Sequence, residues 1–261
     1  LWMESDRMGH LLGAIDQKTL DEQRGVVQNE KRQGENEPYG QAYDQIFRAL
    51  YPQGHPYHHS TIGSMNDLDA ASLEDVKQWF RAWYGPNNAV LVLAGDIDLA
   101  TAKDKVSRYF GDIPAGPALE RVQAGPARRA TTRASMTDKV PQTRIYRTWS
   151  VAPYRDADAT RLLVLSQVLG GSKSSRLDRR LVHEEKLVDK VSTSVWPFEL
   201  ASSFNITADV KQGVDPARVE RIIDEELRRL IAEGPTAEEL AQAQAVLRAD
   251  FVRGIERIGG F

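Results

Sequence analysis

The chain has 261 residues, of which 41% are hydrophobic and 27% are charged, a composition typical of a globular protein with one large or two ordinary domains. Its formal net charge of -3 gives no reason to expect nucleic acid or an anionic membrane surface as a partner. No apolar run approaches the roughly 18 residues that a membrane span needs. The absence of cysteine excludes a disulfide scaffold, a thiolate zinc site and a cysteine nucleophile.

The start of the sequence is not typical of the start of a whole protein. Residues 1–4 lie inside a predicted amphipathic helix and lack the basic start and apolar core of a signal peptide. We therefore expect the fold to be truncated at both ends. Signals that are missing here say nothing about the parent protein.

Apolar periodicity and capping signals predict a mainly helical first half. Residues 19–22 (Thr-Leu-Asp-Glu) form a capping box, in which the hydroxyl and the last carboxylate satisfy free backbone donors at a helix start. Residues 89–95 are a continuous apolar run that is short enough for a buried strand. The helix opened by the box is predicted to run to about Gln33, and further helices are predicted over residues 1–15, 43–50, 72–83 and 98–110.

Residues 114–133 are rich in proline and glycine and show no apolar periodicity, which predicts a linker between domains. After it, strands are predicted over residues 144–151, 191–195 and 203–210, and helices over residues 156–169, 177–187, 215–232 and 236–255. The second half is therefore expected to mix helices and strands.

The two halves share a pattern that suggests an internal repeat. A second capping box begins at Thr236, and like the box at Thr19 it follows one amphipathic helix and opens another. The position that matches Glu30 of the first half is Leu247 in the second. A buried carboxylate must be paired or bind a metal, and a leucine at the matching position implies that the fold itself needs no carboxylate there. Spacing alone favours the simpler interpretation, in which Glu30 is a solvated helix residue.

Short segments in a fixed order extend along nearly the whole chain: Leu20–Glu30, Thr61–Gly63, Gly85–Asn88, Tyr109–Pro114, Leu169–Gly171, Ser174–Leu177 and Glu185–Leu187. Each segment is a weak signal by itself, but the ordered series resembles the insulinase/pitrilysin family of zinc metallopeptidases. The resemblance implies an α+β fold of two related mitochondrial-processing-peptidase-like units. Each unit would pack helices against a mainly antiparallel sheet.

The resemblance also implies a domain arrangement. Residues 1–113 would be the C-terminal part of a catalytic peptidase domain, and residues 114–133 would be the linker. Residues 134–261 would form a second, non-catalytic peptidase-like domain that is truncated at its C-terminus.

Relatives in this family bind zinc through two histidines of an H-x-x-E-H motif and a glutamate on a later helix, and the glutamate inside the motif is the general base. The chain contains no such motif, so the base is expected upstream of Leu1 and no catalytic residue is expected in the chain itself. Glu30 matches the later glutamate, the third zinc ligand. Gln23 stands where the family commonly has a second, supporting glutamate, and an amide there brings no charge.

The resemblance implies that the parent protein is a zinc-dependent metalloendopeptidase that hydrolyses peptides in a chamber between two halves. Relatives hold substrate with an arginine and a tyrosine of the opposing half, but the matching positions here are Val182 and Asp189. The chain alone is therefore expected to be inactive. The alternative is a non-catalytic scaffold or substrate-presenting subunit of the same fold, which the loss of that pair and Gln23 favour. A plain interaction module is a more distant alternative.

The partners implied are a peptide or unfolded protein substrate and the remaining halves of the protease, with zinc as the cofactor of the intact parent. The resemblance also suggests a periplasmic or secreted location. His55, His58 and His59 could in principle form a loop metal site. However, the loop has no nearby acidic partner and matches a non-ligand loop of the family, so surface packing or a lid contact is the preferred interpretation.

Overall fold

A computed structural model describes residues 1–257 and residue 259, and the predicted C-terminal end of the second domain falls outside them. Contacts divide the chain into two compact units. Unit 1 comprises Leu1–Glu37 and Thr61–Val122, and unit 2 comprises Pro38–Ser60 and the chain from Gln123 onward. The boundary at Val122 lies within the predicted linker, but no sequence pattern predicts that residues 38–60 group with the second half. The relatedness of the two halves stays a prediction.

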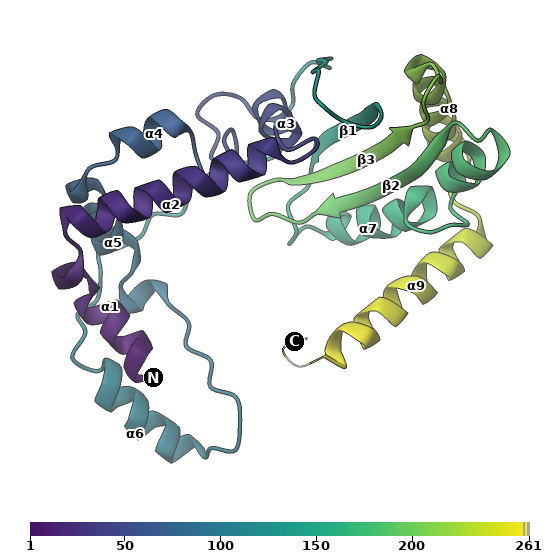
Figure 1. The fold of residues 1–261 in the computed structure, drawn as a ribbon. Helices are drawn as coiled ribbons and strands as arrows, with labels where there is room; N and C mark the ends of the chain where they lie inside the picture. Colours follow the sequence, from purple (N-terminus) through teal and green to yellow (C-terminus); the bar gives the residue numbers. More distant parts are fainter. Residues whose placement is uncertain (258, 260–261) are drawn as a thin grey trace. The chain divides into compact units, whose positions relative to one another are not determined.

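Unit 1 is a set of helices, and its described residues contain no strand (Figure 1). Helix α1 contacts α6, and α2 contacts α4. The short helix α4 begins where Ser64 accepts a hydrogen bond from the amide of Asp67. The elements are α1 (Trp2–Ala14), α2 (Gln17–Asn36), α4 (Met65–Ala70), α5 (Leu73–Trp83), the 3-10 turn η1 (Pro86–Asn88) and α6 (Leu99–Phe110).

The start of α2 differs from the prediction. Asp16, not Thr19, is the N-cap, and its carboxylate accepts hydrogen bonds from the amide and the hydroxyl of Thr19, each at 2.8 Å. The predicted capping box at Thr19 is therefore wrong, because an aspartate three residues earlier satisfies the same amide and the helix begins sooner. The helix start at Ser72 is confirmed and forms a capping box with Asp75.

The strand predicted over residues 89–95 is absent. Those residues have no regular structure, and the side chains of Val90 and Val92 are 90% and 78% exposed. A strand is held by hydrogen bonds to a neighbouring strand, and the described part of unit 1 offers none. The prediction of a buried strand is therefore wrong within the described residues, because an apolar run does not by itself supply a neighbouring strand or a covering layer.

Unit 2 is built on a three-stranded antiparallel sheet of order β1-β3-β2, formed by β1 (Arg144–Val151), β2 (Val188–Trp196) and β3 (Ser202–Val210). These strands confirm the three that the sequence predicts, and β2 begins three residues before the predicted Val191. Helices α7 (Ala157–Gly170), α8 (Pro216–Glu233) and α9 (Ala237–Ile255) are also confirmed. The helix predicted over residues 177–187 is a π-helical turn, η2 (Asp178–Glu184).

One face of the sheet carries the main hydrophobic core. Phe204, Ile206 and Ala208 of β3 share this face and are buried. Helix α7 covers it, since the Thr193 hydroxyl of β2 donates to the carbonyl of Ser166, and Figure 1 shows α7 lying along the sheet. Helix α8 adds Val219, Ile222 and Ile223 to the same cluster. This core accounts for most of the buried apolar side chains of the unit.

The opposite face is covered by residues 38–60, which we call the strap. The strap includes α3 (Ala42–Leu50) and the loop that follows it. The ring of Tyr43 packs on Tyr146 of β1 at 5.8 Å and on Trp196 of β2 at 4.8 Å between centroids. Tyr51 is fully buried, and its hydroxyl donates to the carbonyl of Ala201 at 3.0 Å. A segment from the first half of the sequence thus completes the packing of the second unit.

Replacing Ile206 with alanine should lower the free energy of unfolding of unit 2 by about 2–5 kcal/mol, because the side chain is only 1% exposed and its removal leaves a cavity in the core. The control is Ile231→Ala on α8, where the side chain is 83% exposed and the expected change is within about 0.5 kcal/mol. Urea unfolding followed by circular dichroism measures both. Equal losses in the two variants would contradict the assignment of the core.

Candidate functional site

Glu30 lies on α2 with an exposed side chain. Its carboxylate makes no hydrogen bond or ion pair within the residues that the structure describes. Its neighbours are engaged: the ammonium of Lys31 pairs with Glu35 at 3.0 Å, and the guanidinium of Arg32 donates to the side chain of Asn29 at 2.9 Å. The carboxylate of Glu30 is therefore available to a ligand or to a group from outside the described chain.

Gln23 lies on the same face of α2 as Glu30, because seven residues correspond to two turns of a helix. Gln23 is exposed as well. Between them, Val26 is exposed and Val27 is half-buried, so the expectation that Glu30 borders a buried face is not met within the described residues. This face of α2 is uncovered from Gln23 to Glu30.

The described residues contain no group of three histidine, cysteine, aspartate or glutamate side chains that could hold a metal ion. A catalytic zinc site needs three protein ligands and one open position. Among the predicted site residues, Glu30 has the right donor atoms and an accessible position for one of those ligands. Its role as a ligand stays a prediction.

The three loop histidines each bond to a backbone group. His55 and His58 bond to the backbone of Gly125 and Tyr51, and His59 bonds to the neighbouring Ser60 carbonyl. Both ring nitrogens of His55 and the Nδ1 atoms of His58 and His59 therefore bond to backbone groups. Packing stays the preferred interpretation of this loop.

The two positions that match the family's substrate-holding pair have different surroundings. Val182 packs against the core of unit 2, and Asp189 is exposed at a bulge of β2 between Val188 and Lys190. Neither position carries a cation or a phenol that could hold a peptide. The described chain thus offers no counterpart of that pair at these positions.

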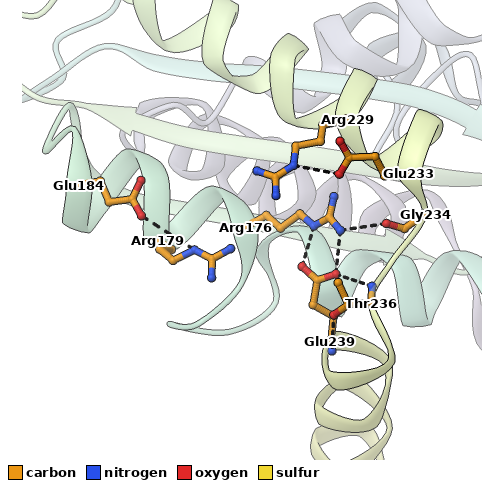
Figure 2. A network of polar contacts seen from close by, with 8 residues as sticks. All are labelled: Arg176, Arg179, Glu184, Arg229, Glu233, Gly234, Thr236 and Glu239. Atoms are coloured by element: carbon orange, nitrogen blue, oxygen red, sulfur yellow. Dashed lines mark hydrogen bonds and ion pairs between the residues drawn. The ribbon is translucent and has the colours of Figure 1, made fainter.

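The sequence did not indicate the most buried ion pair of unit 2, which Figure 2 shows. Arg176 is 4% exposed, and its guanidinium donates to both carboxylate oxygens of Glu239 at 2.7 Å and to the carbonyl of Gly234 at 2.9 Å. The remaining nitrogen, Nη1, is buried without a partner among the described residues. The hydrogen-bonded Arg176 holds the pKa of Glu239 at about 2.

Glu239 has two roles at once, because it also closes the capping box of α9. The Thr236 amide donates to its carboxylate at 2.8 Å, and the Thr236 hydroxyl accepts from the Glu239 amide at 3.1 Å. Arg176, in the segment after α7, is thereby tied to the start of α9. The neighbouring pairs of Figure 2, Arg179–Glu184 and Arg229–Glu233, are exposed. The one sequence feature that could have indicated this pair is the position of Arg176 next to the apolar Leu177. A buried arginine requires a carboxylate partner.

The family model described as "Peptidase M16 inactive domain" matches residues 70–247. This match covers more than half of the chain, and the chain belongs to the peptidase M16 family. The α+β fold with a small antiparallel sheet agrees with it.

Two curated relatives illustrate the range of the family. Zinc protease PqqE of Helicobacter pylori is 26% identical over 260 residues, which cover 97% of this chain and 57% of that protein. The non-peptidase homolog YmxG of the same organism is 26% identical over 199 residues, which cover 74% of this chain and 44% of that protein. The chain thus spans about half the length of these relatives.

Solved structures support the fold. A peptidase M16 inactive domain from Pseudomonas fluorescens matches with a TM-score of 0.82 at 20% identity, over 94% of this chain and 58% of that one. The periplasmic protease PqqL of Escherichia coli matches with a TM-score of 0.66 at 18% identity, over 92% of this chain and 27% of that one. No described helix is both long and apolar enough to cross a membrane.

Replacing Arg176 with alanine should cost about 1.5–3 kcal/mol of stability, because it removes two charge-assisted hydrogen bonds to Glu239, whose side chain is 22% exposed and keeps only its bond to the Thr236 amide. The control is Arg161→Ala on α7, whose pair with Asp158 is exposed and should be worth no more than about 1 kcal/mol. Chemical denaturation at neutral pH compares the two. A loss at Arg161 as large as that at Arg176 would contradict the assigned role.

The same pair predicts a pH dependence. Because the pKa of Glu239 is lowered from 4.5 to about 2, its contribution is complete above about pH 4.5 and is lost as the pH falls toward 2. The stability difference between wild type and Glu239→Gln should therefore be constant above that range and shrink below it. Thermal melts from neutral to acid pH measure this difference. The other carboxylates titrate in both proteins, so their contributions cancel in the difference. A difference that grows on acidification would exclude this linkage.

Proposed function

We propose that the chain is part of a zinc-dependent metalloendopeptidase and that Glu30 is one of its zinc ligands. Membership of the M16 family and relatives named as zinc proteases support the proposal. The observation that carries it is the unpaired carboxylate of Glu30 on an uncovered face of α2. Lys31 and Arg32 bond elsewhere, because residues one and two positions along a helix do not face Glu30.

One carboxylate does not hold zinc tightly, so the other ligands must come from outside this chain. We expect two histidines and the general base from an H-x-x-E-H helix that faces Glu30. When bound, zinc would acidify a water molecule for attack on a peptide carbonyl. Glu30 contributes a negative charge and an oxygen donor, and helix α2 fixes its position.

Gln23 would serve the site from a distance. Seven residues of helix place it about 10.5 Å from Glu30 along the axis, too far for a direct hydrogen bond between most rotamers. Its amide is therefore suited to orient a group on the facing helix rather than Glu30 itself. Because Gln23 carries no charge, its support is weaker than that of the glutamate that relatives commonly have there.

The substrate we propose is a peptide or an unfolded protein bound in an extended form inside a chamber between two halves. Extended substrate would pair with the edge of a sheet. The opposing half must supply the groups that hold it, because Val182 and Asp189 do not. We further propose a periplasmic or secreted location, which the name of the periplasmic relative PqqL supports.

A scaffold or substrate-presenting subunit of the same fold is the second candidate. The matched family model describes an inactive domain, and one relative is named a non-peptidase homolog. Gln23 also favours this alternative. The two candidates differ in the sequence of the parent protein upstream of Leu1: an H-x-x-E-H motif there supports the peptidase, and its absence supports the scaffold.

In the parent protein, Glu30→Gln should lower zinc affinity by more than the roughly 10–100-fold that loss of a supporting outer residue costs, because it removes a charged ligand. Peptidase activity should fall with the zinc content. The control is Glu22→Gln, an exposed residue of the same helix that pairs with Lys18. Metal analysis and peptide hydrolysis measure both variants. Unchanged zinc content in Glu30→Gln would remove this residue from the site.

The chain alone should not hydrolyse peptides, because the general base and the histidine ligands are expected outside it. A fluorogenic peptide assay of the purified chain with added zinc, repeated with a chelator, measures this. Hydrolysis that the chelator abolishes would show that the chain holds a complete site and would overturn the proposed division of ligands.

A further inference from the structure

His55 occupies a position in the strap where only its neutral form fits the hydrogen bonds. The amide of Tyr57 donates to Nδ1 of His55 at 3.0 Å. An imidazole that accepts at Nδ1 carries its proton on Nε2, and Nε2 lies 3.2 Å from the carbonyl of Gly125, to which it donates. Protonation of Nδ1 would place two donors against each other and break the bond to Tyr57.

The other two histidines of the loop have the opposite arrangement. Nδ1 of His58 lies 2.8 Å from the carbonyl of Tyr51, and Nδ1 of His59 lies 3.0 Å from the carbonyl of Ser60. Carbonyls only accept, so both rings donate from Nδ1. A second proton on Nε2 leaves those bonds intact. One loop therefore holds a histidine that protonation disrupts beside two that protonation does not.

His55 is also a contact point between the strap and the rest of unit 2. Its ring stacks on the buried Tyr51 at 4.5 Å and 17°, and its bond to Gly125 joins the strap to the irregular segment after residue 122. Tyr57, held by His55, accepts a hydrogen bond from the Leu200 amide on its hydroxyl and packs on Phe198. Loss of the Tyr57–His55 bond would loosen these contacts together.

The charged and titratable groups packed around the His55 end of the strap are Arg129, Tyr51, Tyr57 and His58. Arg129 donates from Nη1 to the carbonyls of Arg48, Ala49 and Tyr51 and so brings a positive charge to the end of α3. The phenols of Tyr51 and Tyr57 face the ring. Burial raises the pKa of Tyr51 to about 12, so this phenol is neutral at physiological pH. His58 adds a second imidazole that bonds to Tyr51.

We propose that His55 is a proton-sensitive latch that holds the strap on the sheet of unit 2 at neutral pH and releases its Tyr57 end on acidification. The inference is independent of the proposed peptidase function. The sign follows from the bonding: the closed strap requires the neutral imidazole, so this stabilisation is present while the ring is neutral and is lost when the ring is protonated as the pH falls.

Nitrogen-15 NMR of the whole chain tests the latch directly, because there are only five histidines to assign. At about pH 8, His55 should carry its proton on Nε2, whereas His58 and His59 should carry theirs on Nδ1. Below the titration of His55, the hydrogen-exchange protection factor of the Tyr57 amide should fall by up to about tenfold per pH unit.

Two matched variants separate the latch from ordinary packing. In His55→Asn, the amide oxygen can replace Nδ1 as acceptor but does not titrate, so the pH dependence of Tyr57 protection should disappear. In His58→Asn, the side-chain amide can replace the Nδ1 donor, and the pH dependence should remain. A proton on Nδ1 of His55 at high pH, or the same pH dependence in wild type and His55→Asn, would overturn the proposal. The tautomers of the wild type decide the question even if a variant fails to fold.

Discussion

The packing of unit 2 depends on covering both faces of one small sheet. Helices α7 and α8 cover the face that carries Phe204 and Ile206. A three-stranded sheet whose other face was left open would expose Tyr146 and Trp196 to water, and the strap prevents this with Tyr43 and Phe47. The main feature of the unit is therefore a long-range contact between residues about a hundred or more positions apart, for which local sequence patterns carry no signal.

Local signals predicted local structure well. The caps at Ser72 and Thr236 and the strands of unit 2 were correct, because a capping residue acts within one turn and alternation reports the two faces of a strand. The cap of α2 was misplaced by three residues because Asp16 and Thr19 are both good caps and only one can begin the helix. The strand over residues 89–95 failed for a different reason: propensity cannot supply a hydrogen-bonding neighbour.

Less of the candidate site than of the fold can be predicted from the sequence. Glu30 was singled out by a family resemblance, and family membership is now established, but its own chemistry depends on groups that the described chain does not contain. The Arg176–Glu239 pair shows what sequence reasoning missed. Arg176 belongs to a segment that resembles the family, and Glu239 belongs to a predicted capping box. Only the fold reveals that they meet.

The path of the chain has a consequence for how this protein can be divided. It leaves unit 1 after Glu37, contributes the strap to unit 2, returns to unit 1 at Thr61 and leaves again after Val122. Neither unit is a continuous stretch of polypeptide. Dividing the chain in the proline-rich segment between the halves would leave the strap, with Tyr51, on a different piece from the sheet of unit 2, and would open an aromatic face to solvent and to self-association. Because the units are interleaved, no single cut in the gene yields both of them whole. Expression or exchange of the second half alone would have to include residues 38–60 as well.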